Sequence, residues 1–264
     1  MSLDIVAGAL VSSLYFFRLT KVRPSFLYWP LLALVVWLIY LSDHLADSLS
    51  SLNRLNNRLQ FFRTNRKLVL TLLGLTVVSI AILLFFVPAD YFLFGIPGGV
   101  LVILYVFLNQ IQARKNVYFF PREIIIALFY TYGICGLPLL LSVGELKMPL
   151  LFALVYFLLI LTNVLIYSWF EYGSDVENHV QTFAVKFGRP QTRLAGLIVN
   201  SLAFLLSLLL FKFSDQSFLF VAILLTISVG YFAILFGYKF FEKHNAYGLA
   251  ADGLLLLAAL SMLV

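Results

Sequence analysis

The chain has 264 residues, 62% of them hydrophobic and only 11% charged, with a mean hydropathy of +1.01. A soluble domain carries roughly 25% charged residues, so this composition excludes a water-soluble globular protein and predicts an integral membrane protein. The net charge of +6 lies in short segments between apolar runs, which is typical of juxtamembrane loops and argues against a nucleic-acid-binding surface. We interpret residues 1–264 as a single polytopic membrane domain.

Nine apolar runs follow one another along the chain. A spanning helix needs about 20 mostly apolar residues, and the runs do not alternate apolar with polar residues as barrel strands do. Backbone groups inside a bilayer must then be satisfied within helices. The sequence therefore predicts an all-α membrane protein with nine transmembrane helices. The predicted spans are Ile5–Phe17, Phe26–Leu41, Leu68–Val87, Tyr91–Ile111, Ile124–Val143, Leu150–Phe170, Leu194–Phe211, Phe218–Tyr238 and Tyr247–Val264.

Basic residues are divided unequally between the two faces that these spans define. If the spans alternate in direction, one face carries 13 of the 18 Lys and Arg residues and the other carries 5. Loops rich in Lys and Arg stay on the cytoplasmic side, so we expect a multi-pass protein of the cell membrane with a cytoplasmic N-terminus. All three histidines and most acidic residues fall on the same face.

The second run ends in two carboxylates, Asp43 and Asp47, that are four residues apart. On a helix they share one face, with Cβ atoms about 5–6 Å apart, and repel each other. The negative end of the helix dipole disfavours them as well. These two penalties indicate a compensating cation, and Mg²⁺ fits because it takes oxygen ligands and keeps room for phosphate oxygens.

The sixth run ends in a similar way, because Glu171, Asp175 and His179 follow one another at intervals of four residues. A tyrosine precedes the first acid in each segment, Tyr40 in one and Tyr167 in the other. We interpret the two segments as a weak internal repeat whose halves each offer a carboxylate pair to one cavity. The alternative is a pair of solvated helix ends whose acids meet water among the headgroups.

At these residues the chain resembles the UbiA superfamily of intramembrane prenyltransferases. The family's second motif reads roughly Asp-x-x-x-Asp-x-x-x-Gly-x-x-Ser/Thr, followed by a basic residue and a glycine. Here Glu171, Asp175, Thr182, Lys186 and Gly188 stand at the matching positions, and a histidine replaces the motif's own glycine.

The family's first motif, roughly Asn-Asp-x-x-Asp-x-x-x-Asp, is matched in part. Asp43 and Asp47 stand at its last two acids, while Ile39 and Tyr40 replace the leading Asn-Asp. Residues 118–122, Tyr-Phe-Phe-Pro-Arg, resemble the family's Tyr-Pro-x-x-Lys-Arg stretch, which faces the diphosphate. The resemblance implies a UbiA-like bundle of nine helices around a cytoplasm-facing cavity.

The resemblance also implies an activity: Mg²⁺-dependent transfer of a prenyl group from a prenyl diphosphate to an acceptor in the membrane lipid. Mg²⁺ would neutralise the leaving diphosphate, and the residues implied to hold it are Asp43, Asp47, Glu171 and Asp175. Basic side chains would clamp the diphosphate and aromatic faces would stabilise an allylic cation. The substrate-binding residues implied are Arg122, Lys186, His179, Tyr40 and Tyr167.

His179 is not expected to bind a transition metal, because the nearby ligands are carboxylates, which suit Mg²⁺. We expect it to fill space or to donate a hydrogen bond to the diphosphate. Asp252 lies inside the ninth run, and an acid within a span is costly and a candidate functional residue. It either faces the substrate cavity or pairs with a neighbouring helix.

Two other functions stay open. The missing Asn-Asp favours a degenerate homologue that binds an isoprenoid or another lipid without catalysis. Carboxylates in a membrane protein are also found in cation and proton transporters. That alternative is weaker, because these acids lie at helix ends and no broken helix marks a central site.

Overall fold

The computed structural model describes residues 3–50, 57–115, 121–178, 180–213, 218–244 and 246–263. These residues form helices and the connections between them. The helices are α1 (Leu3–Leu19), α2 (Tyr28–Ser50), α3 (Asn57–Thr64), α4 (Arg66–Leu84), α5 (Ala89–Lys115), α6 (Arg122–Leu141), α7 (Lys147–Phe170), α8 (Tyr172–Glu177), α9 (Phe183–Phe187), α10 (Arg189–Phe213), α11 (Phe218–Phe236), α12 (Tyr238–Lys243), α13 (Tyr247–Leu255) and the 3₁₀-helix η1 (Leu256–Leu263).

Each of the nine predicted apolar runs overlaps a helix of the described chain, and in the ninth run the helical segments are the short α13 and η1. The observed helix ends differ from the predicted ones where polar residues continue a helix or where a turn interrupts it. Helix α2 runs nine residues past the predicted end at Leu41, so Asp43 and Asp47 are helical. The ninth run changes from an α-helix to a 3₁₀-helix after Leu255.

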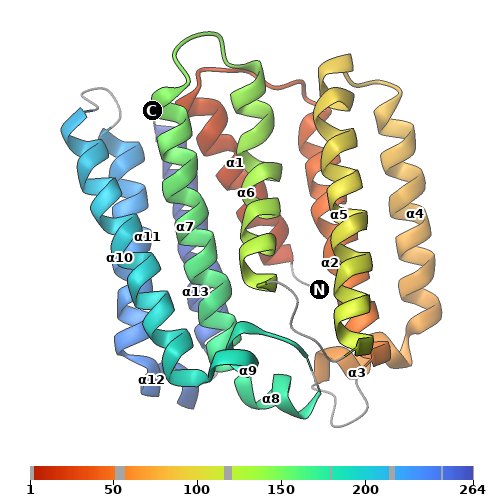
Figure 1. Ribbon diagram of the computed structural model, residues 1–264. Helices are drawn as coiled ribbons and strands as arrows, with labels where there is room; N and C mark the ends of the chain where they lie inside the picture. Colours follow the sequence, from red (N-terminus) through yellow and green to blue (C-terminus); the bar gives the residue numbers. More distant parts are fainter. Residues whose placement is uncertain are drawn as a thin grey trace.

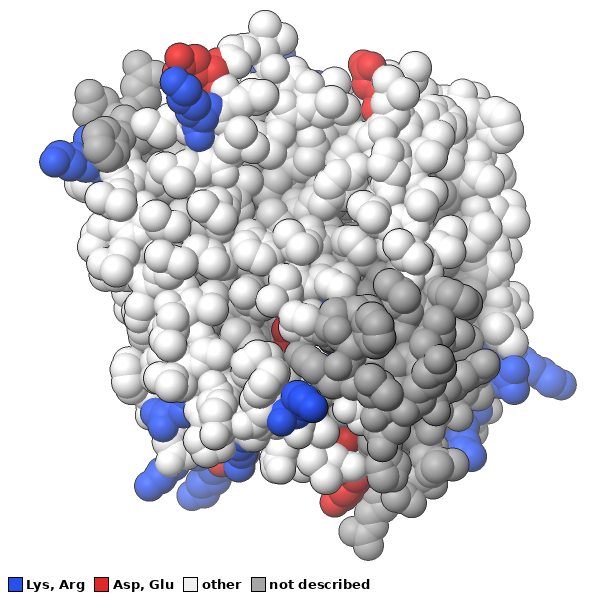
Figure 2. Space-filling view, viewed as in Figure 1, with Lys and Arg blue, Asp and Glu red and all other residues white. Residues whose placement is uncertain are grey.

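Six of the described helices are long and apolar enough to cross a membrane, namely α2, α4, α6, α7, α10 and α11. Two apolar stretches, Ala89–Leu104 and Tyr247–Leu263, are shorter. The molecule is therefore a multi-pass helical membrane protein, and the crossing of the bilayer by nine helices stays a prediction. In the part of the face that Figure 2 colours, most Lys and Arg side chains gather at the two ends, and the surface between them is almost entirely uncharged, as a lipid-facing belt requires.

Helix α7 lies in the interior of the bundle, and its side chains are buried along most of its length. Around it pack α1, α6, α10, α11 and α13, and Figure 1 shows α4 at one edge of the bundle and α10 and α11 at the other. Apolar side chains on α4 are largely exposed, for example Leu75 and Val78. The surroundings of such a surface are lipid, since lipid tails are as apolar as leucine.

Buried hydrogen bonds between helices fix their relative positions inside this apolar bundle. The Asn200 side chain of α10 donates to the Ser228 carbonyl of α11 at 2.9 Å, and the Ser228 hydroxyl donates to Asn200 Oδ1 at 3.0 Å. The Tyr15 hydroxyl of α1 donates to the Phe220 carbonyl of α11 at 3.0 Å. Such bonds favour one packing arrangement where apolar contacts alone do not discriminate between neighbours.

The short helices α3, α8, α9 and α12 gather at one end of the bundle, which we call the short-helix end (Figure 1). Helix α2 ends there, and the first turn of α6 points toward that end from higher in the bundle. Both acidic segments of the sequence lie at this end, because α2 carries the first and α7 continues into α8 with the second. The fold thus brings the two segments to the same side of the apolar belt.

Candidate active site

The first acidic segment contacts the start of α6. A guanidinium nitrogen of Arg122 lies 3.4 and 3.5 Å from the two carboxylate oxygens of Asp43. The Arg122 side chain is 13% exposed and the Asp43 side chain 35%, so the pair lies partly shielded from solvent. The backbone of Asp47 lies one turn further along α2, and its side chain is outside the described part of the structure.

Tyr40 lies one turn before this ion pair and packs against a histidine. Its ring centroid is 4.0 Å from that of His44, and the His44 ring in turn contacts Phe62 of α3 at 5.5 Å. Tyr40 therefore lies among the side chains that join α2 to α3. Its predicted part in a substrate wall stays a prediction.

The second acidic segment begins where α7 ends. Glu171 follows the last residue of α7, and its backbone carbonyl accepts the Asp175 N–H at 2.9 Å. The two acids are therefore one helical turn apart, as their spacing predicts. The hydroxyl of Tyr247, at the start of α13, donates to Glu171 Oε1 at 3.2 Å, and the Tyr247 ring stacks on Phe170 with centroids 4.5 Å apart.

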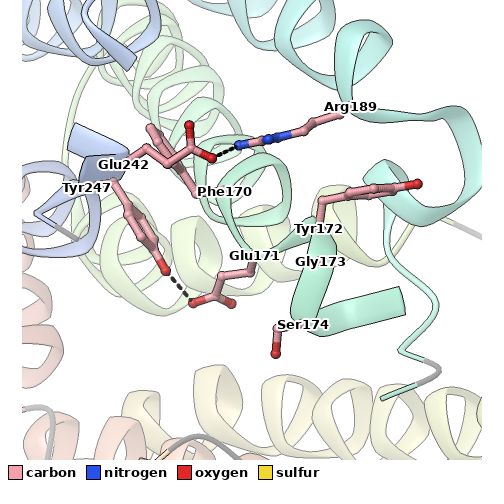
Figure 3. A pocket seen from close by; sticks show the side chains of 8 residues that line it. All are labelled: Phe170, Glu171, Tyr172, Gly173, Ser174, Arg189, Glu242 and Tyr247. Atoms are coloured by element: carbon pink, nitrogen blue, oxygen red, sulfur yellow. Dashed lines mark hydrogen bonds and ion pairs between the residues drawn. The ribbon is translucent and has the colours of Figure 1, made fainter. Parts of the chain in front are cut away.

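Glu171 lines a pocket of about 430 Å³ at the short-helix end (Figure 3). An ion pair between Arg189 of α10 and Glu242 of α12 forms part of its wall. The guanidinium of Arg189 also lies 5.4 Å from the Trp169 ring centroid. The pocket thus combines charged groups with aromatic faces. Its lining residues are Phe170, Glu171, Tyr172, Gly173, Ser174, Arg189, Glu242 and Tyr247.

The segment after α8 is anchored by side chains from two other helices. All three N–H groups at the start of α9 have side-chain acceptors. The Phe183 N–H donates to Glu123 Oε1 of α6 at 2.6 Å, the Ala184 N–H to Ser168 Oγ of α7 at 3.2 Å, and the Val185 N–H to the N-cap Thr182 at 3.4 Å. N–H groups in the first turn of a helix have no partner within it, so these three contacts fix where α9 lies.

Gly188 joins α9 to α10 and has φ +90° and ψ 157°. This backbone conformation is open essentially only to glycine. The Gly188 carbonyl accepts two hydrogen bonds from Thr192, one from its N–H at 3.2 Å and one from its side-chain hydroxyl at 2.9 Å. Lys186, in the last turn of α9, is exposed. The glycine that the sequence motif contains is therefore required by the sharp change of direction after Lys186.

The start of α6 links the first acidic segment to the short helix α9, which follows the second. Arg122 contacts Asp43, and its neighbour Glu123 accepts the backbone N–H of Phe183. Glu123 is only 2% exposed, and its Oε2 atom has no hydrogen-bond partner among the described residues. Two adjacent residues of α6 thus connect helix ends that are more than 100 residues apart in sequence.

Asp252 of α13 contacts α7, which is one of the two arrangements that its position in the ninth run allows. The Tyr167 hydroxyl donates to Asp252 Oδ2 at 2.6 Å, and the Asn163 amide donates to Oδ1 at 3.3 Å. Asn163 also donates to the Tyr231 hydroxyl of α11 at 3.3 Å. Tyr167, the second predicted wall residue, is therefore a hydrogen-bond partner of Asp252.

A preformed metal centre is not seen among the described residues, where no three His, Cys, Asp or Glu side chains are grouped to hold an ion. His179 and the side chain of Asp47 lie outside the described part of the structure. The four predicted carboxylate ligands thus remain a prediction, with three of their side chains placed at the short-helix end.

The fold is similar to that of a solved protein. The "Apo structure of a UbiA homolog from Aeropyrum pernix K1" superimposes with a TM-score of 0.74, covering 100% of this chain and 98% of that one. This chain has the UbiA fold. The two sequences are 10% identical, and no protein-family model and no curated protein matches the sequence. The resemblance seen in the acidic motifs is thus confirmed as a likeness of fold over the whole chain.

Three contributors to this UbiA-fold site are absent from the sequence-based prediction. They are Glu123, Asn163 and Tyr247, whose partners are far away in sequence. A signal was present for two of them. Asn163 lies four residues before Tyr167 on the same face of α7, and Glu123 is an acid in an otherwise apolar helix. No local pattern marks Tyr247.

Proposed function

We propose that this protein transfers a prenyl group from a prenyl diphosphate to an acceptor in the membrane, with Mg²⁺ as cofactor. The observation that carries the proposal is the double contact made by the start of α6. Arg122 contacts Asp43 of the first acidic segment, and Glu123 accepts the backbone N–H of Phe183 in α9, the short helix that follows the second acidic segment, so one element contacts both regions at a single end of a UbiA fold.

The donor chemistry fits Mg²⁺, because Asp43, Glu171 and Asp175 offer carboxylate oxygens at the same end of the bundle. Bound there with Asp47, Mg²⁺ would supply charge neutralisation for the diphosphate leaving group. Asp43 is already paired with Arg122. A partly exposed pair at 3.4 Å is weak, so it can rearrange when a diphosphate arrives.

The chain's own basic residues would hold the diphosphate. Arg122 is oriented by Asp43 at the start of α6, and its planar guanidinium suits bidentate contact with phosphate oxygens. Lys186 is exposed on α9, whose position is set by Glu123, Ser168 and Thr182. Aromatic side chains near the acids, such as Tyr247 and Phe170, offer ring faces to a developing allylic cation.

A non-catalytic lipid-binding homologue is the second candidate, and the Asp43–Arg122 ion pair favours it. In that case Arg122 replaces the metal as the partner of the first acidic segment. The leading Asn-Asp of the family motif is Ile39-Tyr40 here, which removes further oxygen ligands. The two candidates differ in whether the carbon–oxygen bond to diphosphate is broken.

The test is release of pyrophosphate by the purified full chain in lipid nanodiscs. Labelled geranyl, farnesyl and geranylgeranyl diphosphates are supplied with extracted membrane lipid as the source of acceptor. We expect release with Mg²⁺, none with a chelator, and recovery when Mg²⁺ is restored. Saturable binding without release would reject transfer in favour of lipid binding. Lys147→Ala, at the opposite end of the bundle, is the matched control for Arg122→Ala.

A further inference from the structure

Four side chains at the short-helix end, Arg189, Arg193, Trp169 and Tyr238, form a group that we call the arginine cluster. Arg189 and Arg193 are one turn apart on α10, and their guanidinium groups lie over the Trp169 ring, 5.4 and 5.8 Å from its centroid. Arg193 also lies 4.7 Å from the ring centroid of Tyr238, the first residue of α12. Lys and Arg side chains gather at the lower left of Figure 2, where Figure 1 shows the start of α10 and α12. The cluster therefore lies at the edge of the uncharged belt.

Only one of the two arginines has a counter-ion in the part of the chain that the structure describes. Arg189 forms an ion pair with Glu242 of α12. Arg193 is partly buried and has no ion-pair partner among the described residues. Like charges one turn apart on a helix repel each other, and burial adds to the cost of a charge without a counter-ion. The arginine cluster therefore indicates a site for an anion.

A structural role accounts for part of the Arg193 side chain. Its Nε–H donates to the Leu235 carbonyl at 3.1 Å, and carbonyls in the last turn of a helix such as α11 have no donor within the helix. A guanidinium has five N–H groups, and the four on the terminal nitrogens of Arg193 have no acceptor among the described residues. The carbonyl and the two rings thus hold the guanidinium in place, while its terminal nitrogens can donate to two oxygens of one phosphate group.

One face of α10 beside the arginine cluster is apolar and exposed. It carries Leu194, Ile198 and Leu202, which are spaced four residues apart and so share one side of the helix. Leu194 is the direct neighbour of Arg193, so this face continues from the cluster into the uncharged belt. A molecule that contacts both regions has an anionic head and an apolar tail.

We propose that Arg193 and Lys239 bind the phosphate group of an anionic phospholipid, whose acyl chains lie along the exposed apolar face of α10. Lys239 directly follows Tyr238 and is exposed, so it adds a second cation to the helix that contacts Arg193. Basic residues between membrane helices near the membrane surface attract the headgroups of anionic lipids. The inference goes beyond the proposed function and does not depend on prenyl transfer.

Two other anions fit the arginine cluster less well. A free phosphate ion makes no use of the apolar face that adjoins Arg193. The diphosphate group of a prenyl donor is expected beside the acidic segments, and Arg193 does not line the pocket next to Glu171. Arg189 does line that pocket, but its charge is already neutralised by Glu242. The arginine without a counter-ion is thus the one beside the lipid-exposed face, which favours a phospholipid.

Fluorescence of Trp169 tests the proposal, because its ring contacts Arg193. In the full chain with Trp29→Phe and Trp37→Phe it is the single tryptophan. Phosphatidylglycerol and phosphatidylcholine with the same brominated acyl chains, which quench tryptophan at close range, are titrated into the protein in detergent micelles. We expect half-maximal quenching at about tenfold less phosphatidylglycerol, since charged hydrogen bonds and a nearby cation both favour the anionic headgroup. Native mass spectrometry of the unsubstituted chain measures retained lipid independently.

Arg193→Gln should reduce the preference for phosphatidylglycerol about fivefold, the scale of one cation at a membrane surface. This change also removes a hydrogen bond to α11, so the melting temperature is measured on the same sample. Lys239→Gln, at an exposed residue, provides a second variant with a similar expected loss. Lys212→Gln removes a cation at the other end of α10 and should keep the preference.

Equal binding of the two lipids by the protein with Arg193 and Lys239 intact overturns the proposal. So does an unchanged preference in a folded Arg193→Gln protein or, where that protein does not fold, in Lys239→Gln. Displacement of phosphatidylglycerol by an equal concentration of inorganic phosphate would show a site for free anions, and displacement by farnesyl diphosphate would place the lipid in the substrate site. Either displacement rejects a phospholipid site at the arginine cluster. None of these outcomes depends on pyrophosphate release.

Discussion

Two charged side chains at the start of α6, Arg122 and Glu123, are held in position by contacts with other helices. Arg122 and Glu123 are neighbours, yet one contacts Asp43 of α2 and the other the backbone of α9. Arg122 and Glu123 have charges of opposite sign. Arg122 contacts a carboxylate, and Glu123 accepts a hydrogen bond from an N–H group. A substitution of one of these residues therefore removes one contact and leaves the other in place.

Asp175 provides the residue-scale prediction. Asp175→Asn keeps the size of the side chain and removes the charge that a metal ligand needs, so we expect prenyl transfer to fall by orders of magnitude. Folding should change little, because removal of one of two acids a turn apart relieves repulsion. Turnover and thermal stability are measured on the same purified sample across a Mg²⁺ titration.

Glu177→Gln is the matched control, because it makes the same charge change on the same short helix. Near-normal turnover of Asp175→Asn with unchanged Mg²⁺ dependence would remove Asp175 from the site. Lower stability with intact turnover would assign it a structural role instead.

At the scale of an element, α9 is too short to be stable by itself. A helix of five residues forms too few hydrogen bonds to offset the entropy lost in ordering its first turn. Its N–H groups are satisfied by Glu123, Ser168 and Thr182, and Gly188 ends it with a positive φ. The turn that presents Lys186 therefore depends on acceptors from α6 and α7 as well as on its own Thr182 and Gly188.

Glu123→Leu should release this turn. The Phe183 N–H loses its acceptor while it remains partly buried, so we expect destabilisation of about 1–3 kcal/mol. Amide hydrogen exchange should quicken most in the segment that contains residues 183–187. Glu123→Gln retains a carbonyl oxygen for the same N–H and should lose less stability.

Glu145→Leu, at an exposed acid outside this contact, is the control for the change in charge and shape. Unchanged exchange in α9 of the Glu123→Leu protein would show that Ser168 and Thr182 suffice to hold it.

At the scale of the whole molecule, the fold separates a largely uncharged belt from two ends that carry most of the visible Lys and Arg side chains (Figure 2). The short-helix end carries both acidic segments and the pocket beside Glu171. Enzymes that act on lipid-bound substrates need such a border, because the charged head of the substrate stays in water and its tail in the bilayer. The uneven distribution of Lys and Arg predicts that this end faces the cytoplasm.

Cysteine labelling tests that orientation. Cys135 is buried and is the chain's single cysteine, so Cys135→Ala provides a background without thiols. In intact cells a membrane-impermeant maleimide should label Glu145→Cys, which is exposed between α6 and α7. Lys186→Cys, exposed at the short-helix end, should react only after permeabilisation. The reverse pattern would contradict a cytoplasmic active site.

The amino-acid sequence by itself determined the elements and their chemistry. Apolar runs predict helices because a chain in lipid must satisfy its own backbone, and each of the nine runs overlaps a helix of the described chain. Intervals of four residues placed Glu171 and Asp175 one turn apart, as the Asp175 N–H bond to the Glu171 carbonyl shows.

Only the tertiary structure decided which of these groups meet. Arg122 and Asp43 are 79 residues apart, Phe183 and Glu123 are 60 apart, and Tyr167 and Asp252 are 85 apart. A periodic pattern reports which face of a helix a residue occupies. It does not report which neighbour packs against that face, because an apolar stripe fits many partners in lipid. Contacts such as the Tyr167 hydroxyl over Gly248 depend on that choice.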